Sequence, residues 1–158
     1  YKTGEVIPEE LVKKLEASSR FNTGFRTVEL CGAALLDIEW HKMNYAKDID
    51  VAKFERAVAR RLGLPEEIQF RYRSSYFKHI FGSDQYAAGY YTYLWAEVLS
   101  SAAASLFKEQ GMYDQEAAKS YLQNILEAGD SEDAMTLFKR FRGREPQVEA
   151  LLKDRGLK

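Results

Sequence analysis

Hydrophobic and polar positions repeat with the period of an α-helix over most of the chain. Two acidic residues follow Pro8, and Leu11, Val12 and Leu15 then form a short apolar stripe. Proline suits the first turn of a helix, and acidic residues suit the positive end of the helix dipole. A first helix is therefore expected to start at Pro8.

A second helix is predicted from Thr23 to His41, where the apolar positions again follow helical spacing. Its expected inward face consists of larger apolar residues mixed with small ones: Phe25, Val28, Leu35 and Ile38 with Gly32, Ala33 and Ala34. Small residues let a neighbouring helix approach closely, so this helix is expected to be buried on more than one side.

Capping residues predict where the remaining helices begin and end. Asp50 is a good N-cap for a third helix, and Gly63 closes that helix. The longest helix is expected from about residue 85 to residue 110, with Gly111 as its C-cap. The last three helices are predicted to begin at Asp114, at Asp130 or Ser131, and at Pro146, and to end near Leu126, Gly143 and Gly156.

The stretch from Glu66 to Gly82 is less regular, and we expect an extended segment that runs into a short helix or turn. Six or seven helices without a convincing strand predict an all-α, multi-helix bundle. A length of 158 residues suits one domain over residues 1–158.

Composition narrows the classes of function. The chain has 23 Lys and Arg against 24 Asp and Glu, a net charge of -1, which argues against a nucleic-acid partner. The single Cys31 excludes a disulfide within the chain and a thiolate zinc cage, and it favours a reducing, cytoplasmic location. No apolar run approaches the roughly 20 residues of a membrane span, so no membrane partner is expected.

Several tyrosines surround Gly89. On a continuous helix Tyr86, Tyr90 and Tyr93 stand at i, i+4 and i+7, which places three phenols on one face. A phenol ordinarily stays protonated, with a pKa of about 10, so these groups and the nearby His79 are candidate donors to peptide carbonyls or to the oxyanion of a tetrahedral intermediate. The same spacing fits an amphipathic core with buried rings, and spacing alone favours that interpretation.

Arg71 and His41 are less specific candidates. The guanidinium of Arg71 is a possible partner for the carboxylate end of a peptide, or for an acid of the chain itself. His41 lies near the end of the predicted second helix, and Glu39, two residues earlier, faces another direction. His41 is therefore interpreted as a histidine favoured by the helix dipole.

Long stretches of the sequence resemble one known family. They are Tyr-Phe-Lys-His-Ile-Phe at 76–81, Tyr-Ala-Ala-Gly-Tyr-Tyr-Thr-Tyr-Leu-Trp-Ala-Glu-Val at 86–98, Gly-Asp-Ser-Glu-Asp-Ala at 129–134 and Phe-Arg-Gly-Arg-Glu-Pro at 141–146, with the opening at 21–41. Together they resemble the zinc oligopeptidases, a family that includes thimet oligopeptidase, neurolysin, oligopeptidase A and peptidyl-dipeptidase. The resemblance covers essentially the whole chain.

The resemblance implies roles for particular residues. His79 and Tyr93 match catalytic donors to the substrate or to the transition-state oxygen, and Tyr86 and Tyr90 match tyrosines that contact the bound peptide. Arg71 is retained as a further substrate-binding candidate. The loop Gly82–Gln85 is longer and poorer in glycine than the family pattern.

The resemblance also implies a zinc cofactor that this chain does not bind. The family's His-Glu-x-x-His motif is absent, since the sequence contains only His41 and His79. We therefore expect the C-terminal part of a metallopeptidase that hydrolyses short peptides, inactive by itself and partnered by the rest of its polypeptide. The chain opens on a tyrosine, which agrees with this expectation. The alternative is a helical module that binds a peptide or partner without catalysis.

Overall fold

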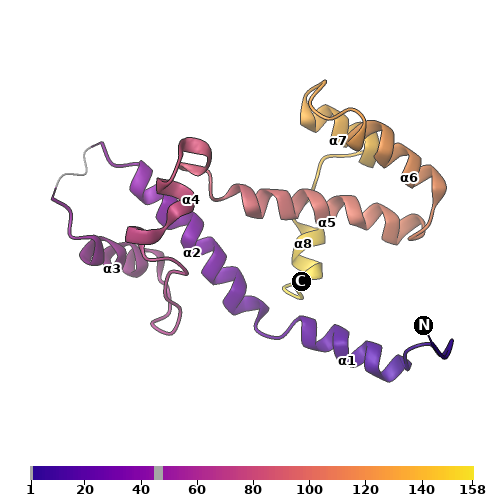
Figure 1. The fold of residues 1–158 in the computed structure, drawn as a ribbon, viewed down its shortest axis with the longest axis horizontal. Helices are drawn as coiled ribbons and strands as arrows, with labels where there is room; N and C mark the ends of the chain where they lie inside the picture. Colours follow the sequence, from indigo (N-terminus) through magenta and orange to yellow (C-terminus); the bar gives the residue numbers. More distant parts are fainter. Residues whose placement is uncertain (1, 45–47) are drawn as a thin grey trace. The chain divides into compact units, whose positions relative to one another are not determined.

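The computed structural model describes residues 2–44 and 48–158, and the regular structure of these residues is entirely helical (Figure 1). The predicted all-α class is confirmed. The chain divides into two compact units, residues 1–91 and 92–158, so the single domain stays a prediction. None of the described helices combines the length and apolar character that a membrane crossing needs.

The first unit contains three helices of more than two turns, α1 (Glu9–Ser19), α2 (Thr23–His41) and α3 (Val51–Leu62). Pro8 occupies the N-cap of α1, as the sequence predicts. The Asp50 carboxylate accepts the Lys53 N–H at 3.0 Å, and Gly63 ends α3 with φ 67°. Both predicted caps of α3 are confirmed.

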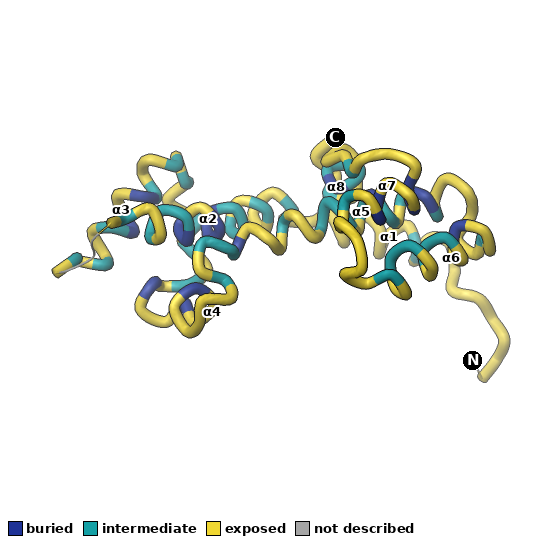
Figure 2. The backbone as a smooth tube through the Cα atoms, turned by 90° about the horizontal axis from the view of Figure 1, so that it is seen from above, coloured by how far each residue is buried: buried dark blue, intermediate teal, exposed yellow. Residues whose placement is uncertain are grey.

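The inward face of α2 differs from the expected one. Phe25 and Leu35 are each 45% exposed, whereas Leu36 and Asp37 are fully buried beside Ala33. The buried positions lie in the C-terminal half of the helix (dark blue in Figure 2). A Cβ at Gly32 would lie in ordinary contact, 3.6 Å from the Leu64 side chain, so this part of α2 packs against the segment that follows α3. The expected small residues Gly32, Ala33 and Ala34 are buried, whereas most of the expected larger apolar residues are exposed and the polar Asp37 is buried in their place.

The segment after α3 follows the expected irregular course. It contains a 3-10 turn, η1 (Ser74–Tyr76), the single-turn helix α4 (Lys78–Phe81) and a second 3-10 turn, η2 (Asp84–Tyr86). Phe77 and Ile80 are 1% and 2% exposed and anchor the segment in the core of the first unit.

The second unit contains α5 (Thr92–Gln110), α6 (Gln115–Tyr121), a π-helical turn η3 (Leu122–Leu126), α7 (Ala134–Arg142) and α8 (Glu149–Asp154). Leu106, Ala117 and Phe141 form its buried centre. Arg142 is also buried, and its guanidinium donates to the Ala102 carbonyl at 3.0 Å and to Glu109 at 2.6 Å.

Two helix starts in this unit were predicted wrongly. The N-cap of α7 is Asp133, which accepts the Thr136 N–H at 2.9 Å, instead of Asp130 or Ser131. α8 begins at Glu149, three residues after Pro146. The predicted cap Asp114 is confirmed, since its carboxylate accepts the Ala117 N–H at 2.8 Å.

Candidate functional site

The tyrosine-rich stretch is a turn followed by a helix, so the prediction of one helix from about residue 85 is wrong. Residues 84–86 form η2, residues 87–91 form turns, and α5 begins at Thr92. Ala88 has φ 55°, in the left-handed region that L-residues avoid. The expected helical face shared by Tyr86, Tyr90 and Tyr93 is therefore not formed.

The turn instead brings two of these tyrosines to His79. The His79 ring lies 6.1 Å from the Tyr86 ring and 5.6 Å from the Tyr90 ring, between centroids. Phe77 lies 5.0 Å from Tyr90, and Tyr72 lies 4.7 Å from Phe77 and 5.6 Å from His79. These five residues, Tyr72, Phe77, His79, Tyr86 and Tyr90, are called the aromatic cluster below.

The aromatic cluster has a buried side and an open side. Phe77 and Tyr90 are 1% and 3% exposed, whereas Tyr86 and Tyr72 are half-buried and His79 is exposed. Edge-to-face contacts, such as the 77° between the rings of Phe77 and Tyr90, hold the polar rings against the apolar one. His79 and Tyr86 are thus the members best placed to meet a ligand.

Arg71 borders the aromatic cluster through one ring. Its guanidinium carbon lies 5.5 Å from the centroid of the Tyr72 ring, a distance typical of a cation–π contact. Arg71 is exposed, so a carboxylate can reach its guanidinium from solvent.

Tyr93 belongs to the second unit. It lies in the first turn of α5 and is 37% exposed. The structure therefore brings together His79, Tyr86 and Tyr90 in one unit, with Arg71 beside them, and places Tyr93 in the other.

A buried carboxylate that the sequence analysis did not single out holds the turn. Asp37 is fully buried, and its Oδ1 and Oδ2 accept the backbone N–H groups of Ala88 at 3.0 Å and Tyr90 at 2.8 Å. The sequence does contain a sign of this role, because Asp37 directly follows the apolar residues 33–36 of α2. Burying a carboxylate is costly unless it is hydrogen-bonded, so an aspartate at such a position predicts donors nearby.

His41 completes the surroundings of Asp37. Its Nδ1 lies 2.7 Å from Asp37 Oδ1, one helical turn earlier. Glu39, which faces away from His41, pairs with Lys42 at 3.0 Å and with Arg61. The hydrogen bond from Lys42 lowers the pKa of the Glu39 carboxyl, with Arg61 acting in the same direction.

A second buried carboxylate holds the other end of the segment. Glu55 on α3 is 4% exposed; it accepts the Ser74 N–H at 2.7 Å and an Arg73 guanidinium N–H at 3.1 Å. The Trp40 indole N–H donates to the Ser74 hydroxyl at 2.7 Å. α2 and α3 together therefore fix the backbone that leads into α4 and His79.

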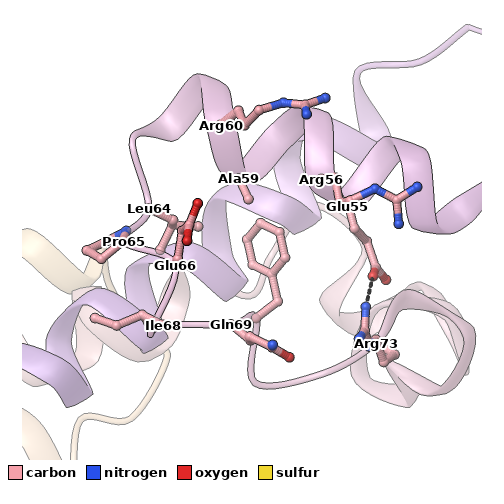
Figure 3. A pocket seen from close by; sticks show the side chains of 11 residues that line it. Glu55, Arg56, Ala59, Arg60, Leu64, Pro65, Glu66, Ile68, Gln69 and Arg73 are labelled. Atoms are coloured by element: carbon pink, nitrogen blue, oxygen red, sulfur yellow. Dashed lines mark hydrogen bonds and ion pairs between the residues drawn. The ribbon is translucent and has the colours of Figure 1, made fainter.

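A pocket of about 420 Å³ lies beside this second attachment. Figure 3 shows α3 on one side of it and the loop after α3 on the other, with the ion pair of Glu55 and Arg73 at one edge. Its lining combines arginine side chains with apolar ones and includes Arg56, Arg60, Leu64, Ile68 and Phe70. The candidate residues of the aromatic cluster do not line it.

The part of the chain that the structure describes has no group of three or more His, Cys, Asp or Glu side chains placed to hold a metal ion. The residues present therefore do not fit a catalytic zinc site, which requires three protein ligands.

Comparison with known proteins now identifies the family. The family model described as peptidase family M3 matches residues 1–157. The chain belongs to peptidase family M3. It is 42% identical over 160 residues to dipeptidyl carboxypeptidase of Escherichia coli (strain K12), covering 99% of this chain and 23% of the relative.

Other relatives are similar over the same length. Oligopeptidase A of E. coli (strain K12) is 40% identical over 163 residues, which cover 100% of this family M3 chain and 23% of the relative. Probable cytosolic oligopeptidase A of Arabidopsis thaliana is 37% identical over 163 residues, which cover 99% of this chain and 23% of the relative. The chain thus spans less than a quarter of the length of these relatives.

Proposed function

We propose that this chain is the C-terminal, substrate-handling part of a longer zinc metallopeptidase that hydrolyses short peptides as an oligopeptidase or a peptidyl-dipeptidase. The observation that carries the proposal is the grouping of His79, Tyr86 and Tyr90 around one partly open edge in a family M3 chain. The names and lengths of the relatives support a peptidase larger than this chain.

Each polar residue of the site has a role in this proposal. The imidazole of His79 and the phenol of Tyr86 lie at the open side of the aromatic cluster and donate hydrogen bonds to carbonyls of the bound peptide. Tyr90, which the family resemblance matches to a peptide contact, is buried and packs against the His79 ring, so in this proposal it supports that ring. Arg71, exposed beside Tyr72, pairs with a carboxylate of the peptide, for which a planar guanidinium is well suited.

Tyr93 and His79 are proposed to stabilise the oxyanion that forms when the scissile carbonyl is attacked. A neutral phenol is a suitable donor for such a charge, and the Tyr93 side chain is partly exposed in the first turn of α5. The family resemblance implies zinc; its ligands would come from outside this chain, because the described residues offer no metal-ligand cluster.

The test for Tyr93 is kinetic. In the longer protein, Tyr93→Phe is expected to lower kcat by on the order of 10² to 10³, the usual loss for one oxyanion donor. Tyr91→Phe, which alters an exposed tyrosine two residues earlier, is the control and is expected to leave kcat unchanged. An unaltered kcat in Tyr93→Phe, with normal folding and zinc content, would remove this role.

The partners proposed are short peptides and the rest of the polypeptide. The cytoplasmic location inferred from the single cysteine stays a prediction.

A further inference from the structure

The segment that carries the aromatic cluster is attached to the helices by two buried carboxylates. Glu55 of α3 accepts the Ser74 N–H at its start, and Asp37 of α2 accepts the Ala88 and Tyr90 N–H groups at its end. Asp37 contacts the stretch that contains two candidate peptide-binding residues, so its effect on the site is the more direct.

The hydrogen bonds of the turn alternate between local acceptors and Asp37. The Ala87 and Gly89 N–H groups donate within the turn, to Asp84 and Tyr86 carbonyls at 3.4 and 2.8 Å. The Ala88 and Tyr90 N–H groups donate to the two oxygens of Asp37. The carboxylate therefore takes the donors that would otherwise continue a helix from η2 into α5.

This arrangement also holds a strained backbone. Ala88 has φ 55°, a conformation that an alanine does not adopt without support from its surroundings. A Cβ at Gly89 would lie 3.3 Å from Tyr86 Cα, so the chain passes close to itself at this point. The conformation of the turn depends on an acceptor from another helix.

We propose that Asp37 is a positioning residue for peptide binding: by accepting the Ala88 and Tyr90 amides, it sets where the Tyr90 and Tyr86 rings stand against His79. This inference rests on the proposed function, because it assumes that the aromatic cluster contacts peptide. Asp37 is fully buried and touches no substrate, so it acts through the turn.

His41 supports the same carboxylate from the side. Its Nδ1 lies 2.7 Å from Asp37 Oδ1 and 2.9 Å from the Asp37 carbonyl oxygen. Its ring stacks on Phe81 at 6.0 Å, the last residue of the helical turn that carries His79. The Asp37 side chain thus accepts two backbone amides from the turn and has the His41 imidazole of its own helix beside it.

The test uses the longer protein with Asp37→Asn. An asparagine has one acceptor oxygen and an NH2 that donates, so one of the two backbone amides loses its acceptor while the size of the side chain is kept. Glu39→Gln is the matched control, because Glu39 lies on the same helix and pairs with Lys42 and Arg61 away from the turn.

Two quantities are measured: hydrogen exchange of the Ala88 and Tyr90 amides, and the affinity for a short peptide made uncleavable by N-methylation of its scissile amide. Asp37→Asn is expected to speed exchange of these amides by at least about tenfold and to weaken binding by at least about fivefold. Glu39→Gln is expected to change neither.

The outcomes separate this inference from the proposed function. Unchanged exchange in Asp37→Asn overturns the attachment, and faster exchange with unchanged affinity overturns the positioning role. If His79→Ala also leaves affinity unchanged, the proposed function itself fails. Should Asp37→Asn not fold, His41→Leu removes the imidazole that lies beside the same carboxylate, at a partly exposed position. Smaller changes of the same sign support the inference, and no change overturns it.

Discussion

Single buried carboxylates decide the local structure around the candidate site. Asp37 and Glu55 are 0% and 4% exposed, and both accept backbone amides from a segment without long helices. Hydrogen bonds to charged acceptors are stronger than those between neutral groups. Each carboxylate thus replaces the backbone acceptors that a continuous helix would have supplied.

Glu55 allows a direct measurement of this effect on stability. Glu55→Ala leaves the Ser74 N–H without its acceptor and removes the partner of Arg73, so we expect a loss of about 1–3 kcal/mol in the free energy of unfolding. Chemical denaturation of the 158-residue chain measures it. The control Glu66→Ala, at an exposed residue lining the same pocket, is expected to stay within about 0.5 kcal/mol. Equal effects of the two substitutions would contradict the account.

Most helix ends marked by a local cap were predictable, although the cap Asp133 of α7 was missed. Asp50, Asp114, Gly63 and Gly143 all act as the sequence suggests, because a capping side chain or a left-handed glycine needs only neighbouring backbone. The turn before α5 was not predictable in this way. Two of its backbone amides, those of Ala88 and Tyr90, donate to Asp37, which is 51 and 53 residues away in the sequence. Helical periodicity does not predict a contact between residues so far apart.

The candidate site was also predictable from local motifs and not from contacts between distant residues. Family motifs identified His79, Tyr86 and Tyr90, which the structure brings together. The helical spacing offered as their geometric reason was wrong, and neither Asp37 nor the pairing of His41 with it was foreseen. These contacts join α2 to a later segment and depend on tertiary folding.

The N-terminus of α7 carries a pH-dependent contribution. Backbone and side-chain hydrogen bonds from Thr136 lower the pKa of the Asp133 carboxyl below its usual 3.8. A carboxyl whose pKa is depressed on folding stabilises the fold above its unfolded pKa, and this contribution is lost as the pH falls through the folded pKa. Asp133→Ala should therefore destabilise the chain near neutral pH and make little difference in acid.

Denaturation of the chain and of Asp133→Ala across pH measures this contribution. The difference in unfolding free energy is expected to shrink once the pH passes below about 4. A difference that stays constant from about pH 6 to about pH 3 would contradict the capping role of the charged carboxylate.

At the scale of the whole molecule, several large apolar side chains of α1 and α2 in the first unit are exposed. Leu11 and Leu15 of α1 are 48% and 61% exposed, and Phe25 and Leu35 of α2 are each 45% exposed. Large exposed apolar patches mark surfaces that contact other protein. With relatives more than four times as long, we interpret these faces as contacts with the rest of the polypeptide.

The isolated chain is expected to lack peptidase activity and to bind no stoichiometric zinc, because its described residues hold no cluster of metal ligands. Metal analysis of the purified chain, together with a fluorogenic peptide assay, measures both. Turnover above background, or tightly bound zinc at one ion per chain, would show that a complete site lies within these residues.

The most direct test of the central claim is the affinity of the longer protein for an uncleavable short peptide. If the open side of the aromatic cluster binds the peptide backbone, His79→Ala should raise Kd by roughly tenfold, as expected for one lost hydrogen bond. Lys78→Ala, an exposed neighbour on the same helical turn, should leave Kd unchanged. An unchanged Kd in His79→Ala, with the fold intact, would contradict the account.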